Sequence, residues 1–209
     1  MDIVMLAAGT SSRMGNINKM LLPYKNTSLV CFCCLQALRF LQKYSEQTDE
    51  SCTLIIVTGY RRPSVEKALK DCKSFIGETN SKLKMIVVNN PNYRNGQFTS
   101  TKVGVSQVAD KSPFFISLAD MPLILAENYE ILTPLLSDND AVRPFTVVNG
   151  ERHPGHPVLH AYKLKEKILS MPDDYSVSKI LKSCKVIEPE FQDISWSKDI
   201  DVETDYKLM

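Results

Sequence analysis

The first two thirds of the chain contain a series of short apolar runs. Polar loops and segments whose apolar residues recur at helical spacing separate these runs. Four runs of β-branched and other apolar residues stop abruptly at polar residues or glycine, as buried strands do; they cover residues 3–8, 52–57, 83–88 and 114–118. Helices are predicted at residues 29–43, 63–71, 101–109 and 126–136. The signals are apolar residues at helical spacing, capping residues, or a proline suited to the first turn of a helix. The polar stretch 44–51 is interpreted as a loop. This alternation predicts an α/β fold with a mostly parallel sheet and helices on both faces.

The last third of the chain has a less regular pattern. Residues 141–148 are rich in β-branched side chains, Asn149-Gly150 is a hairpin signal, and residues 155–160 lie on the expected returning strand. The pattern therefore predicts an added β-hairpin in the second half. Further short elements are expected, namely helices at 164–169 and 177–183 and a strand at 185–187. No proline- or glycine-rich linker divides the chain, so one domain spanning residues 1–209 is expected.

Four polar loops follow the predicted parallel strands, at residues 8–19, 58–62, 89–100 and 119–122. The carboxyl ends of parallel strands meet at one edge of a sheet, and open α/β sheets bind ligands there. The loop after residue 8 carries Gly9, Arg13 and Lys19. Free backbone N–H groups beside two cations suit a phosphate site. The alternative is an ordinary turn between a strand and a helix with two solvated cations.

Acidic residues stand at the fourth of these loops and near the end of the chain. Asp120 follows a very apolar strand, and one carboxylate there suits a hard cation such as Mg²⁺; a helix N-cap is the alternative. Asp199 and Asp201 flank Ile200 and would share a face of an extended segment. One of them is therefore a candidate second carboxylate for the same ion, unless the segment is a solvated acidic tail.

The histidines, at positions 153, 156 and 160, all fall within the predicted hairpin. Spacings of three and four do not keep one face of a strand, which argues against a three-histidine metal site. His156, between Gly155 and Pro157, has either a functional role or a structural hydrogen bond. The sequence has neither a GxSxG elbow nor a recognisable Cys/His pair, which disfavours a covalent hydrolase.

Composition narrows the environment and the partners. The 209 residues carry a net charge of +1 and no basic stripe with interleaved aromatics, so nucleic acid is not an expected partner. The amino-terminal segment resembles neither a signal peptide nor a membrane span. Six cysteines without CxxC spacing are expected to be reduced thiols in a cytoplasmic protein, mostly in the core.

Four motifs in collinear order carry a resemblance to a known family. They are LAAGTSSRMGNINKMLLP at 6–23, LADMP at 118–122, GHPVLH at 155–160 and DIDVETDY at 199–206. Together they resemble the MobA-like nucleotidyltransferases that modify the molybdenum cofactor, in the branch of the molybdenum cofactor cytidylyltransferases. The match covers nearly the whole chain. It implies a Rossmann-like three-layer sandwich that transfers a nucleoside monophosphate, CMP from CTP, to molybdopterin or a related phosphorylated small molecule with Mg²⁺ and releases pyrophosphate.

The resemblance also implies roles for individual residues. Arg13, Lys19 and Asp120 would be catalytic, Asp120 and Asp201 would bind the metal, and His156 and Asp174 would bind the acceptor. The implied nucleotide site comprises Leu6, Ala7, Ala8, Gly9, Arg13, Lys19, Thr58, Gly59, Gly96, Ser100 and Asp120. A molybdoenzyme or its maturation factor is an implied protein partner.

Three departures from the family pattern keep other functions open, and one of them is that the first loop does not specify the base of the nucleotide. One extra residue separates Gly15 from Lys19, and the family's Gly-Asp-x-Gly-Ala-Arg run is replaced by residues 173–178, with Ser178 in place of the arginine. If that run holds the pterin, its replacement leaves an acceptor other than molybdopterin open. The alternatives are a sugar- or polyol-phosphate nucleotidyltransferase and a catalytically silent nucleotide-binding chaperone for a cofactor enzyme.

Overall fold

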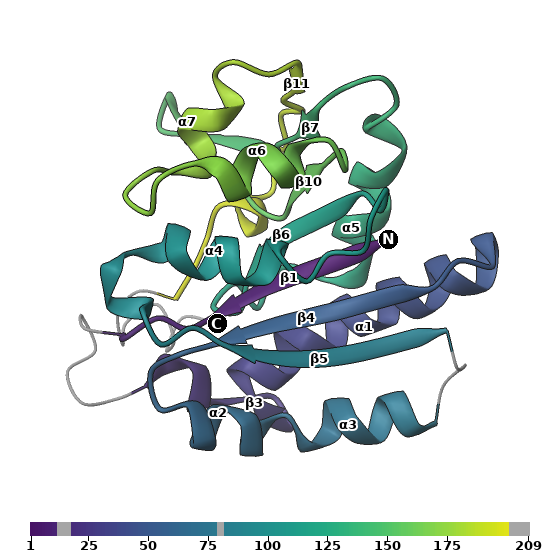
Figure 1. The fold of residues 1–209 in the computed structure, drawn as a ribbon, viewed down its shortest axis with the longest axis vertical. Coiled ribbons are helices and arrows are strands. Elements are labelled where there is room, and N and C mark those ends of the chain that lie inside the picture. Colours follow the sequence, from purple (N-terminus) through teal and green to yellow (C-terminus); the bar gives the residue numbers. More distant parts are fainter. Residues whose placement is uncertain (12–17, 79–81, 201–209) are drawn as a thin grey trace.

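A seven-stranded sheet forms the centre of the protein in a computed structural model, which describes residues 1–11, 18–78 and 82–200 (Figure 1). The strand order is β11-β7-β10-β6-β1-β4-β5. Strand β10 runs antiparallel to its neighbours β6 and β7, and the other adjacent pairs are parallel. The strands of this sheet are β1 (Asp2–Ala7), β4 (Cys52–Thr58), β5 (Leu83–Asn89), β6 (Phe114–Leu118), β7 (Ala141–Val142), β10 (Val158–His160) and β11 (Val186–Ile187). The predicted α/β class is confirmed.

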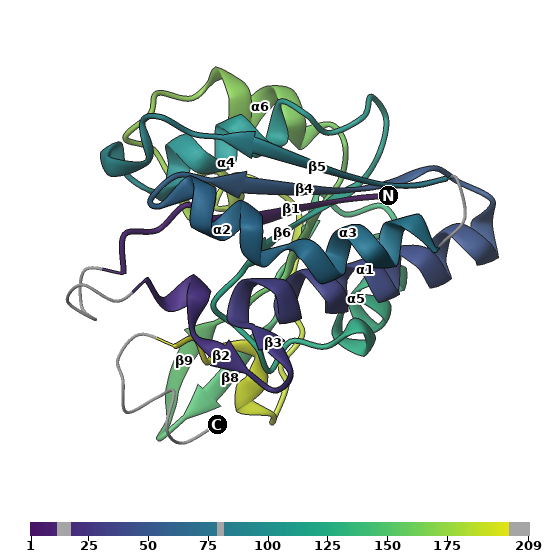
Figure 2. The same ribbon diagram turned by 90° about the horizontal axis from the view of Figure 1, so that it is seen from below.

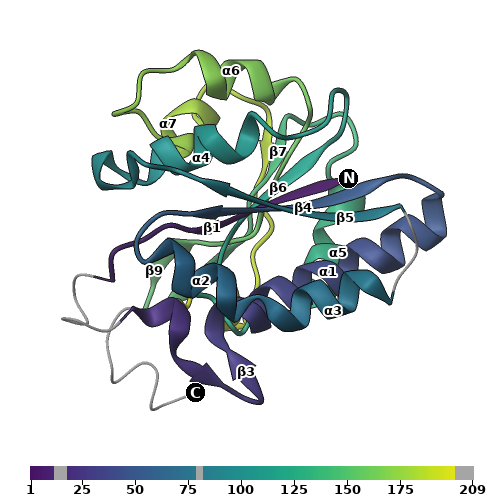
Figure 3. The same ribbon diagram turned by 60° about the horizontal axis from the view of Figure 1, so that its bottom comes forward.

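Helices cover both faces of this sheet (Figures 2 and 3). One face carries α1 (Leu29–Thr48), α2 (Arg62–Ala68), α3 (Lys70–Gly77) and α5 (Ala126–Leu132); the other carries α4 (Gln97–Val105), α6 (Leu164–Ser170) and α7 (Val177–Leu181). Short 3-10 helices are η2 (Lys19–Leu21), η3 (Tyr93–Asn95), η4 (Thr133–Leu135) and η5 (Ile194–Trp196). Two small hairpins complete the fold: β2 (Pro23–Tyr24) with β3 (Thr27–Ser28), and β8 (Phe145–Val148) with β9 (Glu151–Pro154).

Strand β1 explains why the sheet is covered on both sides. All six of its residues are buried. Ile3 and Met5 point into the core beneath α1, whereas Val4 and Leu6 point into the core beneath α4, because side chains alternate along a strand. A strand that is apolar on both faces must be covered on both faces. The carboxyl ends of β1, β4, β5 and β6 consequently form one edge, where the predicted loops meet.

Helix α4 lies unusually close to the sheet at Gly104. A Cβ atom added there would overlap Cγ1 of Val4 and lie 2.8 Å from Cγ2 of Val57. Glycine at this position therefore sets the distance between α4 and the two central strands. This distance also fixes the amino terminus of α4, which lies at the ligand-binding edge.

Several helix predictions were wrong in extent, among them the helix predicted at 126–136, in which α5 ends at Leu132 and the 3-10 helix η4 follows. The segment interpreted as a loop, 44–51, continues α1 to Thr48, because Ser45 is buried and its hydroxyl donates to the Glu50 carbonyl at 2.7 Å. Asp49 ends the helix in a left-handed conformation with φ 60°. The helix predicted at 63–71 is divided at Leu69 into α2 and α3.

The helix predicted at 101–109 begins earlier than expected, at Gln97, and ends at Val105. Its first turn is polar in sequence and was interpreted as a loop. Thr99 stabilises this turn, because its hydroxyl donates to the Gly96 carbonyl at 2.8 Å. Gly96 itself has φ 110°, which suits the sharp entry into the helix.

The predicted single strand at 141–148 is interrupted at Arg143-Pro144. Strand β7 joins the central sheet, whereas β8 pairs with β9 in the added hairpin. The expected returning strand is interrupted as well, because β9 ends at Pro154 and β10 returns to the central sheet. The placement of all three histidines in one hairpin was therefore wrong. His153 lies on β9, His156 in the connection, and His160 in the central sheet.

We expect Gly104→Ala to destabilise the fold by about 1–3 kcal/mol, because the added methyl group overpacks the contact between α4 and the sheet. Gly77→Ala in α3 is the matched control; its added methyl group meets nothing within 4 Å, and a change within about 1 kcal/mol is expected. Urea unfolding followed by circular dichroism measures both variants. A Gly104→Ala variant as stable as the wild type would contradict the packing described here.

Candidate active site

A cavity of about 690 Å³ opens at the carboxyl edge of the sheet, and we call it the Lys19 cavity. Segments that are distant in sequence line it, because the loops after β1, β4, β5 and β6 all end at this edge. The lining residues are Leu6, Ala8, Gly9, Thr10, Ser11, Lys19, Met20, Tyr60, Tyr93, Arg94, Gly96, Gln97, Ser100, Leu118 and Asp120. The size is sufficient for a small-molecule ligand.

A Lys–Asp ion pair lies in the wall of this cavity. Lys19 Nζ is 2.5 Å from Asp120 Oδ2, and the two side chains are only 11% and 15% exposed. The ammonium group also donates to the Ile200 carbonyl at 2.9 Å. The pair is therefore largely desolvated, and its charges interact much more strongly than they would in water.

Local hydrogen bonds hold both partners of this pair in place. Asn18 caps the turn of η2, where its side-chain oxygen accepts from the Met20 backbone at 3.1 Å. The Lys19 backbone donates to Ser11 Oγ at 3.0 Å, which ties η2 to the loop after β1. On the other side, the backbone N–H of fully buried Ile200 donates to the Asp120 carbonyl at 2.9 Å. The segment near residue 200 is therefore part of the site.

Tyrosines form another part of the cavity wall, and they depend on Gly59. A Cβ atom added to Gly59 would lie 2.8 Å from Cβ and Cγ of Tyr93 and 3.0 Å from Cβ of Ala8. The backbone of Tyr60 donates to the Ala8 carbonyl at 3.3 Å, and the rings of Tyr60 and Tyr93 are 6.4 Å apart. Gly59 therefore permits three loops to meet without a gap.

A buried asparagine fixes the start of α4 against the end of β5. Asn90 is 1% exposed, and its side-chain amide donates to the hydroxyls of Thr99 and Ser100, both at 2.8 Å. Its backbone donates to the Thr58 carbonyl at 2.8 Å. The first turn of α4 is thus held rigidly between the Lys19 cavity and its neighbour.

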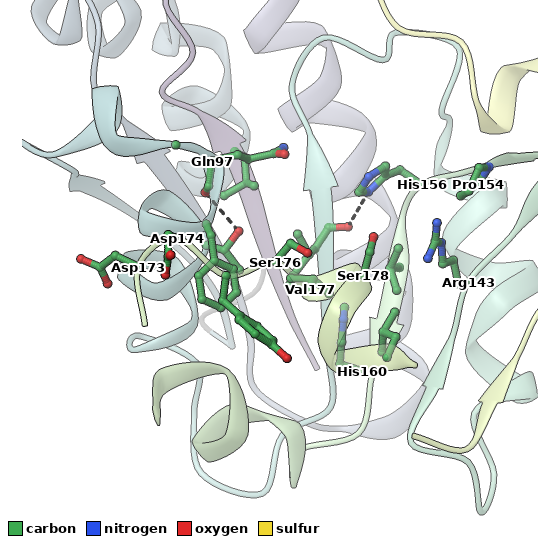
Figure 4. A pocket seen from close by; sticks show the side chains of 18 of the residues that line it. Gln97, Arg143, Pro154, His156, His160, Asp173, Asp174, Ser176, Val177 and Ser178 are labelled. Atoms are coloured by element: carbon green, nitrogen blue, oxygen red, sulfur yellow. Dashed lines mark hydrogen bonds between the residues drawn. The ribbon is translucent and has the colours of Figure 1, made fainter. Parts of the chain in front are cut away.

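A second cavity, of about 270 Å³, adjoins the first, and we call it the His156 cavity (Figure 4). Leu6, Gly96 and Gln97 line both cavities, so the two are contiguous. The second cavity lies between the start of α4, the end of β9, β10 and the segment 173–178. Its labelled side chains are Gln97, Arg143, Pro154, His156, His160, Asp173, Asp174, Ser176, Val177 and Ser178.

His156 is held firmly at the edge of this second cavity. The peptide bond to Pro157 is cis, and the His156 backbone donates to the Trp196 carbonyl at 2.8 Å. Its Nδ1 contacts the Ile116 carbonyl at 3.4 Å (Figure 4). Because a carbonyl can only accept, this contact assigns the proton to Nδ1 and leaves Nε2 as an acceptor. Burial lowers the pKa of His156, so the ring is neutral at neutral pH.

Comparison with known proteins reveals a family match and a curated relative. A family model described as the MobA-like NTP transferase domain matches residues 3–188. The chain belongs to this family. The molybdenum cofactor cytidylyltransferase of Escherichia coli (strain K12) is 26% identical over 205 residues, which cover 98% of this chain and 93% of that protein. The chain is thus a nucleotidyltransferase of the MobA-like family.

Solved structures share the fold of this MobA-like NTP transferase. Rv0371c of Mycobacterium tuberculosis H37Rv superimposes with a TM-score of 0.73 at 21% identity, over 99% of this chain and 95% of that one. The same mycobacterial protein solved with manganese gives a TM-score of 0.69 at 20% identity, over 99% and 96%. The 4-diphosphocytidyl-2C-methyl-D-erythritol synthase of Anaerococcus prevotii gives 0.65 at 14%, over 99% and 92%.

The structure brings most of the predicted site residues of this MobA-like NTP transferase together. The Lys19 cavity contains Leu6, Ala8, Gly9, Lys19, Gly96, Ser100 and Asp120, and the His156 cavity contains His156 and Asp174. Ala7, Thr58 and Gly59 line neither cavity. Thr58 is fully buried and its hydroxyl donates to the Val88 carbonyl at 3.3 Å, so it supports the wall from behind. Arg13 and Asp201 lie outside the described residues, and their roles stay predictions.

Sequence reasoning missed several lining residues. Tyr60, Tyr93 and Arg94 lie in two loops that were already placed at this edge, so their position could have singled them out. Arg143 had no such signal, whereas His160 stands in the GHPVLH motif but was given no role. His160 is fully buried and stacks on Phe114 with ring centroids 5.1 Å apart, and burial lowers its pKa to about 4.

The described part of the chain constrains metal binding and membrane association. Within residues 1–11, 18–78 and 82–200, no three His, Cys, Asp or Glu side chains form a cluster that could hold a metal ion. Asp120 offers a single hard oxygen ligand beside open cavity space, which fits a cation that takes its other ligands from phosphates. In the same described ranges, every helix is too short or too polar to span a bilayer.

The partly buried pair between Lys19 and Asp120 should be strongly coupled in the ligand-free protein. In a double-mutant cycle of Lys19→Met and Asp120→Asn, we expect a coupling energy of about 1–3 kcal/mol in the free energy of unfolding. The exposed pair Lys43–Glu130, whose side chains are 53% and 34% exposed, is the matched control and should give less than about 1 kcal/mol. Equal coupling in the two cycles would show that burial does not strengthen the Lys19–Asp120 pair.

Proposed function

We propose that this nucleotidyltransferase transfers CMP from CTP to a phosphate group of molybdopterin or a related phosphorylated small molecule, with release of pyrophosphate. The observation that carries the proposal is the pair of contiguous cavities joined at Leu6, Gly96 and Gln97, one of which contains Lys19 and Asp120. One cavity suits the triphosphate and the other the acceptor. Such an arrangement brings two substrates together at a common border.

The proposed reaction needs positioning and charge neutralisation more than covalent help from the protein. An oxygen of the acceptor phosphate attacks the α-phosphorus of the nucleotide. The bond from that phosphorus to the bridging oxygen of the β-phosphate breaks, and pyrophosphate leaves with the electron pair. Lys19 is placed to neutralise charge that develops on the transferring group. The backbone of the loop at Gly9 supplies N–H donors to the phosphates.

We propose that Asp120, with Asp201, holds Mg²⁺ when the nucleotide binds. When bound, this ion would neutralise phosphate charge. Lys19 Nζ lies 2.5 Å from Asp120 Oδ2, so the ammonium group is next to the carboxylate that would hold the ion. Lys19 then exchanges the carboxylate for the triphosphate as the nucleotide enters. The Lys19 ammonium and the Asp120 carboxylate would then each have a partner of opposite charge before and after the nucleotide binds, so no buried charge would be left unpaired.

The choice of CTP is supported by the name of the Escherichia coli relative, and the choice of molybdopterin by that name and by the LADMP and GHPV motifs. A molybdoenzyme or its maturation factor is the corresponding protein partner.

We place the protein in the cytoplasm, because all six cysteines are free thiols, as expected in a reducing compartment. The replaced run at residues 173–178 lines the His156 cavity, so it bears on the acceptor and leaves the nucleotide unaffected.

Pyrophosphate release tests this proposal directly. Each of the four NTPs is incubated with Mg²⁺ and a panel of acceptors comprising molybdopterin, sugar phosphates and polyol phosphates. We expect release only when an acceptor is present, and most of it with CTP and molybdopterin. Lys19→Met should lower the rate by about 10²–10³, whereas Lys43→Met should not.

Other outcomes of this assay point to other functions. Release with a sugar or polyol phosphate alone would show a different acceptor class. Nucleotide binding without release in any combination would favour the catalytically silent chaperone.

Asp120→Asn should abolish metal-dependent turnover while the fold is retained, because the amide is a much poorer ligand for a hard cation. A loss of at least about 10²-fold in kcat is expected, together with loss of the effect of Mg²⁺ on CTP affinity. Asp110→Asn is the control, since Asp110 is exposed and pairs with Lys165. Full activity in Asp120→Asn, with its circular dichroism spectrum unchanged, would overturn the metal assignment.

A further inference from the structure

Arg143 is a cation without a described partner on the wall of the His156 cavity. It follows β7, where its backbone N–H donates to the Ile187 carbonyl at 2.9 Å, and its side chain is half-buried. Within the described part of the chain, the guanidinium makes neither an ion pair nor a hydrogen bond. A partly desolvated arginine that is fixed in place and unpaired is a group prepared for an anion.

The acidic residues closest to this cavity form their ion pairs with other cations. Glu188 pairs with Arg152 at 2.6 Å and acts on Arg143 only through its charge, and Asp173 pairs with Lys102 at 2.9 Å. Asp174 is exposed at the opposite side of the cavity (Figure 4). Burial lowers the pKa of Arg143, but an arginine stays protonated at neutral pH, so the positive charge is retained. The cavity therefore has a cationic side and an acidic side.

His160 supplies an independent sign that this cavity receives a polar ligand. It lines the cavity and is fully buried, yet neither ring nitrogen has a hydrogen-bond partner among the described residues. A buried polar group without a partner is costly, so such groups are rare unless a ligand satisfies them. With His156 neutral as well, the cavity offers one cation and two neutral imidazoles.

The position of Arg143 separates it from the expected point of reaction. Gln97 lies at the border shared with the Lys19 cavity, and Figure 4 shows Arg143 on the opposite side of the His156 cavity from Gln97. The attacking phosphate of an acceptor must enter at that border to reach a nucleotide in the Lys19 cavity. A different part of the acceptor therefore reaches Arg143.

We propose that Arg143 binds a second anionic group of the acceptor, remote from the phosphate that receives the nucleotide. This inference rests on the proposed function for the assignment of the cavity to the acceptor. The acceptor class is then a small molecule that carries a second anionic group besides the phosphate that receives the nucleotide. Arg143 is a specificity-determining residue that holds this second group.

The experiment uses inorganic phosphate as the probe and the Nε–Hε NMR signal of Arg143 as the reporter. The full chain is first saturated with Mg²⁺ and a non-hydrolysable CTP analogue, so that the Lys19 cavity is filled. We expect phosphate to shift the Arg143 signal in a saturable way. Arg143→Gln should weaken phosphate binding, followed by backbone amide shifts around residue 156, by about tenfold or more. Arg143→Lys should retain part of the affinity because it keeps the charge.

Arg62→Gln is the matched control. Arg62 is exposed, pairs with Glu66 at 2.6 Å and lies in α2 on the other face of the sheet, and its loss should leave phosphate affinity unchanged. The proposal is overturned if the Arg143 signal does not move, or if Arg143→Gln binds phosphate as tightly as the wild type. The NMR measurement requires no turnover, so it tests anion binding at Arg143 separately from catalysis. Anion binding at Arg143 together with no pyrophosphate release in the assay above would contradict only the proposed function.

Discussion

A buried lysine needs an anion, and this need organises the ligand-binding edge of the protein. Lys19 is 9% exposed, and its ammonium group contacts the Asp120 carboxylate and the Ile200 carbonyl. The pair joins the loop after β1, the turn after β6 and the segment near residue 200. These three segments are remote in sequence; the sheet topology brings the loops to one edge, and the ion pair holds the segments together there, because a desolvated charge needs a partner. The same geometry gives the site its proposed chemistry, because a phosphate and a cation can replace the two partners.

Backbone packing gives this edge its rigidity. Gly104 lets α4 approach the sheet, Gly59 lets Tyr93 approach Ala8, and Asn90 fastens the first turn of α4 to the end of β5. The start of α4 consequently forms a fixed partition between two cavities. A fixed partition is useful in a transfer reaction, since the attacking and leaving groups must lie in line. The protein would thus contribute to the proposed transfer by holding the two substrates in fixed positions and by supplying charged groups beside them.

The first two thirds of the fold could be predicted because the strands there are long apolar runs. Strand β6 was predicted with its observed bounds, and the common edge followed from the alternation of strands and helices. The strands of the second half could not be predicted with their observed bounds, and the reason is their length. Strands β7 and β11 have two residues each, which is too short for a periodic pattern. The polar first turn of α4 was misread because tertiary contacts at Asn90 stabilise it.

The candidate site divides in a similar way. Lys19, Asp120 and His156 stand in motifs that sequence makes visible. Among the described residues Arg143 forms no ion pair, and neither ring nitrogen of His160 makes a well-aligned hydrogen bond. Such pairing depends on the three-dimensional fold, so no local sequence pattern encodes it. The acceptor side was therefore less predictable than the nucleotide side.

A crystal structure with Mg²⁺ and a non-hydrolysable CTP analogue would show whether the nucleotide displaces the contact between Lys19 and Asp120. We expect Lys19 Nζ to leave Asp120 and contact the triphosphate, while the Asp120 carboxylate coordinates the ion. A nucleotide bound elsewhere, with the 2.5 Å contact between Lys19 and Asp120 intact, would contradict this expectation.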